Sequence, residues 1–315
     1  MSAPATGTNV DMQVTLGPLK LKNPVMTASG TFGYGTEYRE LYDPAILGGV
    51  FLKALTMAPR PGNKPWRIYE TPSGMLNSIG LQNVGIEEFF EKKEPFCREL
   101  AGKGTAMCAN LAAQTVEEFQ QLVERLETTD CIAAYELNVS CPNVKKGGCQ
   151  FGTDPTLLRE LVAAVRPGTK RPLIVKLAPQ VTDVAEMARI SVDAGADIIS
   201  LINTFPAMAI DAEKRRPILA TVTGGLSGPA IKPIALRMVY AVRQAVDVPI
   251  IGMGGIMNWK DAAEFLLAGA SAVAVGTANF VHPTTPVEVL EGLQDYCRRH
   301  RYARVSDLTG ALELP

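Results

Sequence analysis

The feature that most constrains the fold of this chain is an eightfold alternation of short apolar segments and amphipathic helical patterns. The apolar segments span 24–30, 49–56, 105–111, 133–143, 173–179, 197–204, 248–256 and 272–280. The clearest helical patterns span 87–100, 115–126, 154–165, 181–194, 231–245 and 258–268, with a weaker one at 36–47 and a last helix at 286–299. Continuous apolar strands that alternate with helices are typical of a parallel sheet covered by helices.

Eight such units predict an α/β fold, a closed (β/α)₈ barrel. Alternation on both sides of a Gly-Pro turn at 12–22 predicts a β-hairpin that covers the amino-terminal end of the barrel. An open doubly wound sheet is the alternative, but GTFGYG at 30–35 lacks the G-x-G-x-x-G spacing expected after its first strand. No linker-like stretch divides the chain, so we expect one domain over residues 1–315.

Charge and composition narrow the function. The net charge is −1 and no basic block occurs, which argues against a nucleic-acid partner. Residues 1–13 lack the apolar core of a signal peptide, and no apolar run approaches the ~18 residues of a membrane span, so we expect a cytoplasmic protein. The 6 cysteines form no C-x-x-C pair and only 2 histidines occur, so we expect no metal site and no Ser-His-Asp site.

The chemically most distinctive segment is YELNVSCPN at 135–143. Alternation through Asn138 predicts a strand, and Pro142 removes a backbone donor that would continue it. Cys141 falls where this strand ends, with Asn138 and Asn143 on either side. Amides can fix a planar polar ligand, and a thiol can act as base or nucleophile. A lone cysteine is more often a small buried hydrophobe, but asparagine is unfavourable in strands, so we interpret the segment as functional.

Other polar residues lie where predicted strands end, and the carboxyl ends of barrel strands share one face. Lys53 and Lys176 lie in apolar strand sequences, where a buried ammonium is costly unless it is paired or binds an anion. Either lysine could pair with a carboxylate such as Glu136, but two of them beside amides favour ligand binding. The remaining polar strand ends are Ser29, Asn110, Asn203 and Thr204.

Glycine ends the last two predicted strands, at Gly254-Gly255 and at Gly276-Thr277. Bare backbone NH groups there can wrap a phosphate, although glycine also ends strands simply to make turns. The two pairs together predict a phosphate-bearing ligand. The connections 73–85 and 205–229 are long and without clear periodicity, so we expect functional loops there, with Asn77 and Ser78 as further donors.

These segments resemble the dihydroorotate dehydrogenase family over about 24–280. The resemblance rests on NVSCPN (138–143), NSIGLQN (77–83), INT (202–204), IGMGGI (251–256) and AVGTANF (274–280). Cysteine at position 141 is similar to the class 1 enzymes, since the membrane-bound class carries serine there. GGCQFGTDP at 147–155 and GLSGPAIKPIALRMVY at 225–240 resemble class 1B, the NAD-linked type, rather than the fumarate-linked 1A.

The resemblance implies an FMN enzyme that oxidises (S)-dihydroorotate to orotate in the synthesis of UMP. Cys141 would remove the carbon-5 proton, and the carbon-6 hydride would pass to the flavin. The implied substrate contacts are Lys53, Asn77, Ser78, Ile79, Gly80, Leu81, Asn138, Asn143, Asn203 and Thr204. The implied FMN contacts are Ser29, Lys53, Ala54, Asn110, Asn138, Lys176, Ile202 and Gly228, with Gly254, Gly255, Gly276 and Thr277 at the phosphate.

The resemblance also implies a partner. The chain has no Rossmann fingerprint and no cysteine cluster, so it has no visible means of binding NAD or relaying single electrons. Class 1B pairs such a chain with an electron-transfer subunit that carries FAD and a [2Fe–2S] cluster. The implied assembly is a heterotetramer built on a homodimer of this chain.

Three other functions remain open at this point. One is a related flavin barrel that reduces uracil or thymine, which orotate binding would distinguish. Another is a lyase or aldolase that uses Lys53 or Lys176 as a Schiff-base amine. The last is a non-catalytic barrel that binds a phosphorylated ligand, which leaves Cys141 and both lysines without a role.

Overall fold

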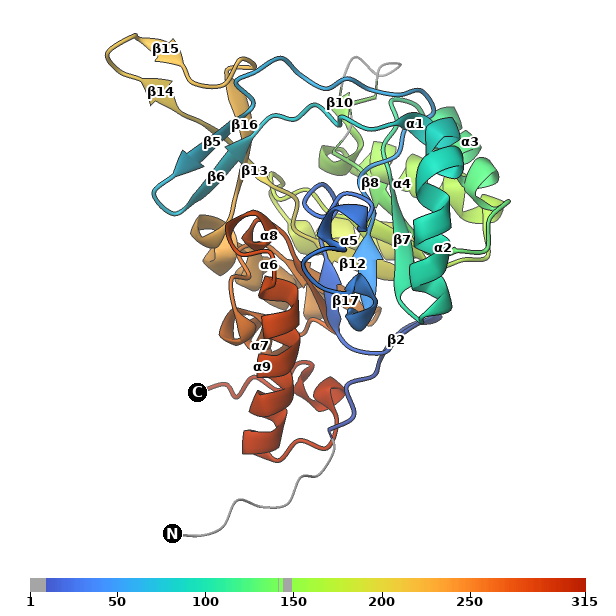
Figure 1. Ribbon diagram of the computed structural model, residues 1–315, viewed down its shortest axis with the longest axis vertical. Helices are drawn as coiled ribbons and strands as arrows, with labels where there is room; N and C mark the ends of the chain where they lie inside the picture. Colours follow the sequence, from blue (N-terminus) through green and yellow to red (C-terminus); the bar gives the residue numbers. More distant parts are fainter. Residues whose placement is uncertain (1–9, 141, 144–148) are drawn as a thin grey trace.

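Eight parallel strands close into a barrel in the computed structural model, which describes residues 10–140, 142–143 and 149–315 (Figure 1). The last strand pairs with the first, with Val273 beside Val25, so the open-sheet alternative is wrong. All eight predicted strands form, each shorter than its apolar segment. They are β3 (Val25–Thr27), β4 (Gly49–Phe51), β7 (Ala106–Leu111), β8 (Ile132–Asn138), β11 (Leu173–Lys176), β12 (Ile198–Leu201), β17 (Ile250–Met253) and β18 (Ala272–Val275).

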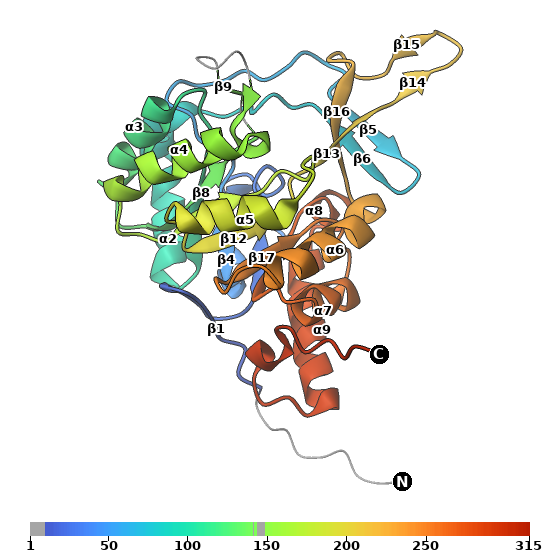
Figure 2. The ribbon, with the colours of Figure 1, turned by 180° about the vertical axis from the view of Figure 1, so that it is seen from behind.

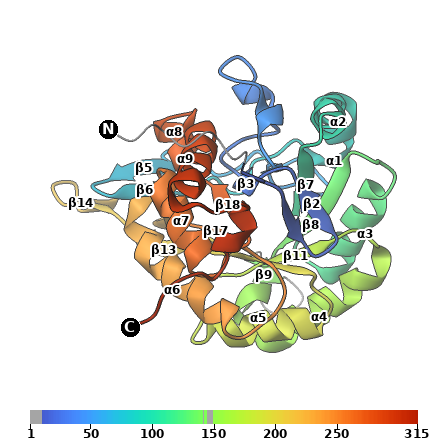
Figure 3. The same ribbon diagram turned by 90° about the horizontal axis from the view of Figure 1, so that it is seen from below.

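Helices surround the barrel on the outside (Figures 2 and 3). The Asp154 and Asn258 side chains accept hydrogen bonds from the first turns of α4 (Pro155–Val165) and α7 (Trp259–Leu267), as N-caps do. Gly195 and Gly269, with φ of 112° and 119°, follow the ends of α5 (Val184–Asp193) and α7. The longer helices are α2 (Glu94–Gly102), α3 (Val116–Leu126), α4 (Pro155–Val165), α5 (Val184–Asp193), α6 (Lys232–Arg243), α7 (Trp259–Leu267) and α9 (Thr285–His300).

Two predicted helices differ from the structure. The helix expected at 87–100 is divided into α1 (Gly85–Glu88), a π-helical segment η3 (Phe89–Lys93) and α2. Pro95 has no N–H to donate, so α-helical hydrogen bonding cannot run through it. The helix expected at 36–47 is wrong: only the 3₁₀ turns η1 (Thr36–Tyr38) and η2 (Pro44–Ile46) form, because Pro44 starts a new turn that the Asp43 side chain caps.

The predicted amino-terminal hairpin is confirmed. Strands β1 (Val14–Leu16) and β2 (Leu19–Leu21) pair antiparallel, and Leu16 and Leu21 are buried. The turn at Gly17 packs near the backbone oxygen of Asp197, just before β12 begins. The hairpin therefore lies against the amino-terminal end of the barrel.

A second sheet lies at the carboxyl end of the barrel strands, where irregular loops were expected (Figure 1). It is antiparallel, in the order β13 (Phe205–Met208), β16 (Thr223–Ser227), β6 (Gly74–Asn77) and β5 (Ile68–Thr71). The two connections lacked a periodic sequence pattern, but they form strands because Gly225 of β16 pairs with both Pro206 and Asn77. Beyond this sheet, β14 (Ile210–Asp211) and β15 (Arg216–Pro217) form a protruding arm.

The remaining elements are short. They are β9 (Pro142–Asn143), β10 (Cys149–Gln150), η5 (Phe151–Thr153), η6 (Arg166–Gly168), η7 (Pro229–Ile231), α8 (Ala278–Val281) and η8 (Val305–Leu308). Within the described ranges, the helices are all too short or too polar to cross a lipid bilayer.

Close approach of the first two barrel strands gives a stability prediction. A Cβ on Gly48 would collide with the backbone carbonyl oxygen of Asn23, which neither strand can move aside. We expect Gly48→Ala to cost about 2 kcal/mol or more of unfolding free energy, and thus several degrees of melting temperature. The matched control is Gly102→Ala at the end of α2, where nothing lies within 4 Å of the added methyl. Equal melting temperatures for the two variants would contradict this packing.

Candidate active site

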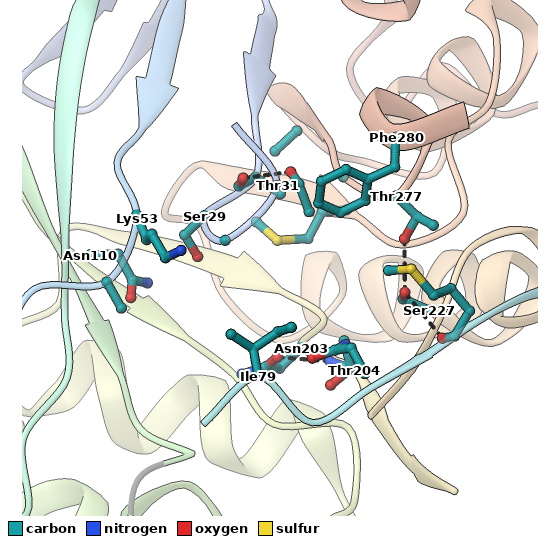
Figure 4. Close-up of a pocket in the computed structure, with 18 of the residues that line it drawn as sticks. Ser29, Thr31, Lys53, Ile79, Asn110, Asn203, Thr204, Ser227, Thr277 and Phe280 are labelled. Carbon is teal, nitrogen blue, oxygen red and sulfur yellow. Dashed lines mark hydrogen bonds between the residues drawn. The ribbon is translucent and has the colours of Figure 1, made fainter. Parts of the chain in front are cut away.

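A cavity of about 690 Å³ lies between the carboxyl ends of the barrel strands and the second sheet (Figure 4). Every predicted site residue whose side chain the structure describes lines this cavity. Cys141 lies outside the described residues, as does the side chain of Asn143. The predicted residues at the wall are Ser29, Lys53, Ala54, Asn77, Ser78, Ile79, Gly80, Leu81, Asn110, Asn138, Lys176, Ile202, Asn203, Thr204, Gly228, Gly254, Gly255, Gly276 and Thr277.

The floor of the cavity holds a buried polar network from four adjacent strands. Strand register places Asn110 beside Glu136, and Lys176 beside Ser200. The Glu136 carboxylate accepts hydrogen bonds from Asn110 Nδ2 (2.5 Å) and Ser200 Oγ (2.7 Å). Lys176 Nζ lies 3.9 Å from Glu136 Oε2 and 3.2 Å from Ser29 Oγ. Lys176 therefore has both an ion-pair partner and a place at the cavity wall.

The nitrogen and the oxygen of the Asn110 side-chain amide differ in their hydrogen bonding. Its Nδ2 donates to Glu136, whereas its Oδ1 is buried without a hydrogen-bond partner in the described part of the chain. A buried acceptor without a partner is rare in folded proteins. A ligand that presents a donor at the cavity floor would complete it, as the N–H of a flavin ring can.

Lys53 differs from Lys176 in position and pairing. It lies two residues beyond the end of β4, so the prediction of a lysine inside a core strand is wrong in this case. Its backbone N–H donates to Gly33 O at 2.8 Å, which holds the segment after β4 against the chain following β3. The ammonium makes no hydrogen bond or ion pair with the residues that the structure describes.

Partial burial lowers the pKa of Lys53, mainly through desolvation. The carboxylate of Glu37 opposes this shift and the guanidinium of Arg67 adds to it. A half-buried ammonium without a partner attracts an anion, because ion pairing restores part of the lost solvation.

Polar side chains at the ends of β8 and β12 are joined by hydrogen bonds. Asn203 Nδ2 donates to Ser140 Oγ (2.8 Å) and more weakly to Asn138 Oδ1 (3.4 Å), and Asn203 Oδ1 accepts from the N–H of Thr204 (2.8 Å). Strand β8 ends at Asn138, so the expected continuation to Pro142 is wrong and Ser140 lies in a turn. The turn still brings Ser140 to the same side as Asn138.

The ends of β17 and β18 form a close-packed glycine wall. Gly254 and Gly255 have φ of 123° and 80°, a conformation that favours glycine. A Cβ on Gly255 would lie 2.8 Å from the backbone oxygen of Gly228. Nearby, Thr277 Oγ1 donates to Ser227 Oγ at 2.8 Å, which joins the end of β18 to the second sheet (Figure 4). Such backbone leaves room for a phosphate to approach N–H groups.

Sequence reasoning missed two charged residues at the cavity. Arg67 Nη2 donates to Gln82 Oε1 at 2.6 Å, and Glu37 Oε2 accepts from the N–H of Tyr34 at 3.1 Å. Arg67 precedes β5, which showed no recognisable strand pattern, and Glu37 lies in the segment misassigned as a helix. Neither residue had a local sequence signal, since tertiary pairing alone brings its segment to the cavity.

Comparisons with known proteins identify the family of this chain. Residues 11–297 match the family model described as dihydroorotate dehydrogenase. A protein of Pelobacter propionicus is 56% identical over 303 residues, covering 96% of this chain and 99% of that protein. A protein of Bacteroides fragilis is 53% identical over 304 residues, covering 96% and 99%. Both are named dihydroorotate dehydrogenase B (NAD(+)), catalytic subunit. A family match over most of the chain and identity above half over nearly its full length lead to one conclusion: this chain belongs to the dihydroorotate dehydrogenase family.

Proposed function

We propose that this chain is the catalytic subunit of an NAD-linked dihydroorotate dehydrogenase, which oxidises (S)-dihydroorotate to orotate in pyrimidine synthesis. The observation that carries the proposal is the ammonium of Lys53, which has no ion-pair partner among the described residues and lies in a cavity rimmed by asparagine amides. Orotate is an anion whose ring presents amide donors and acceptors. One cation with several carboxamides matches that ligand without excess charge.

The cavity residues also fit FMN, which supplies the acceptor for the hydride that leaves carbon 6 of the substrate. Asn110 Oδ1, which has no hydrogen-bond partner in the part of the chain that the structure describes, suits a ring N–H. The buried Lys176 suits the electron-rich edge of a reduced ring. The FMN contacts that we propose are Ser29, Lys53, Ala54, Asn110, Asn138, Lys176, Ile202 and Gly228, with Gly254, Gly255, Gly276 and Thr277 at the phosphate.

On the substrate side, we assign Cys141 as the base that takes the proton from carbon 5. The proposed substrate contacts are Lys53, Asn77, Ser78, Ile79, Gly80, Leu81, Asn138, Asn143, Asn203 and Thr204. The chain's part is to bind the carboxylate, to hold the ring by its amide edges and to receive that proton.

We also propose that electrons leave through a partner subunit with FAD and a [2Fe–2S] cluster, in a heterotetramer built on a dimer of this chain. The sequence offers no dinucleotide fingerprint and no C-x-x-C pair. The relatives are named as catalytic subunits of NAD-linked enzymes, which supports a division of labour between two chains.

An absorption spectrum of the purified chain tests the proposal. We expect a yellow protein whose flavin band bleaches when dihydroorotate is added without oxygen, whereas NAD added to the chain alone is not rapidly reduced. A yellow protein that binds uracil, and whose flavin band is not bleached by dihydroorotate, would instead support the related flavin barrels that reduce uracil or thymine. A colourless protein that cannot take up FMN, and that borohydride links to a substrate through lysine, would support the aldolase alternative.

The role of Cys141 gives a pH prediction. A free thiol titrates near pH 8.5 and only the thiolate accepts a proton, so anaerobic flavin reduction should speed up as pH rises through that titration. Stopped-flow reduction between about pH 6 and 10 measures this. Cys149→Ser should keep the same pH profile, because Cys149 is not flanked by asparagines as Cys141 is by Asn138 and Asn143. Cys141→Ala should abolish the pH dependence. A rate independent of pH would remove the thiol from this role.

Lys53 gives a binding prediction. Lys53→Met removes a charge-assisted contact and should weaken orotate binding by about 10- to 100-fold, measured by calorimetry on protein of equal FMN content. Lys20→Met, an exposed lysine of the hairpin, is the control. Because burial lowers the pKa of Lys53, wild-type affinity should be full below that lowered pKa and fall as pH rises through it. Unchanged affinity in Lys53→Met would exclude Lys53 as the anion contact.

A further inference from the structure

The Glu136 carboxylate is completely buried at the floor of the barrel, and no step of the proposed reaction uses it. It does not line the cavity itself, but Asn110 and Lys176, two of its three polar partners, do. The third partner, Ser200, lies on β12 and holds the far oxygen at 2.7 Å. Glu136 can therefore influence a ligand in the cavity through Asn110 and Lys176, which line the cavity wall.

The stability of the fold alone does not explain why a carboxylate is buried at position 136. Burying an ion pair costs desolvation that its attraction often fails to recover, and apolar replacements are frequently neutral or stabilising. A fully satisfied buried network does, however, fix side chains in one arrangement. Both Glu136 oxygens accept from neutral donors, and Lys176 lies 3.9 Å from one of them.

The contacts of Glu136 determine which atoms face a ligand. Asn110 Nδ2 donates one of its two hydrogens to Glu136, which orients the amide so that its Oδ1 points away from the carboxylate. This oxygen is buried without a partner in the described chain. Lys176 is drawn toward Glu136 on one side and Ser29 on the other, which leaves N–H donors of the ammonium free for a ligand.

We propose that Glu136 is a positioning residue for the flavin, which orients Asn110 and Lys176 and sets the reduction potential through Lys176. This inference rests on the proposed function, because it requires FMN at the cavity floor. The Glu136 charge offsets part of the Lys176 charge in a region of low dielectric. The residue thus limits how strongly the ammonium favours the negatively charged reduced ring.

The test is the flavin midpoint potential of the FMN-loaded Glu136→Gln variant, measured by equilibration with a reference dye. Glutamine keeps the shape: its Oε1 can accept from Asn110, and its amide can donate to the Ser200 hydroxyl, which can also accept. Without the negative charge, Lys176 favours the reduced state more strongly. We expect the reduction equilibrium to shift about tenfold toward reduced flavin, equivalent to about 30 mV for two electrons.

The control is Glu127→Gln, the same change at the other end of the barrel. Glu127 accepts from Tyr135 and Thr169 hydroxyls at 2.9 and 2.5 Å and lies 3.7 Å from Arg171. Like Glu136, Glu127 accepts hydrogen bonds from neutral donors and lies near a cation, but neither Glu127 nor these partners line the cavity. We expect a lower melting temperature for this variant and an unchanged potential.

Two further variants keep the inference open to refutation. In a Lys176→Met background, Glu136→Gln should shift the reduction equilibrium of the flavin by less than about twofold, because Glu136 acts on the flavin through the charge of Lys176. If Glu136→Gln does not fold, Glu136→Asp, which retracts the carboxylate by one methylene, should shift the potential in the same direction by about threefold. A wild-type potential in either single variant, or an undiminished shift without Lys176, would overturn the inference. A wild-type protein that takes up no FMN would instead refute the proposed function.

Discussion

Parallel backbone pairing around a closed ring is the constraint on which the rest of this molecule depends. Once β18 pairs with β3, all eight strands point the same way, and every strand must end on the same rim. Residues as distant as Ser29 and Thr277 then line one cavity. The ring brings together residues from strand ends that are far apart in sequence.

The second sheet makes this rim an enclosed site. Its strands come from two connections, one after β4 and one after β12, that meet only because β6 pairs with β16. The same pairing supplies Asn77 and Gly225 to one ladder and lets Thr277 reach Ser227. A cover built from paired backbone holds polar groups in fixed positions while leaving a cavity of about 690 Å³ below it.

The two cavity lysines illustrate how surroundings assign different roles to one residue type. Lys176 is 5% exposed and lies beside a buried carboxylate, so it acts as part of a network. Lys53 is half-buried beyond the end of its strand, without an ion-pair partner among the described residues, and its pKa is lowered by desolvation. We propose that the first tunes the flavin and that the second binds the substrate carboxylate.

The sequence by itself determined the barrel, its hairpin and the residues at the strand ends, because apolar periodicity and capping are local signals that survive without a partner. It also determined that Asn110, Lys176 and Asn203 would share one face. Only the tertiary structure decided the second sheet, whose glycine-rich β16 has little strand propensity of its own and pairs with segments far along the chain. It also revealed Glu37, Arg67 and the network of Glu136, since burial and pairing depend on which strands become neighbours, and no local pattern encodes that.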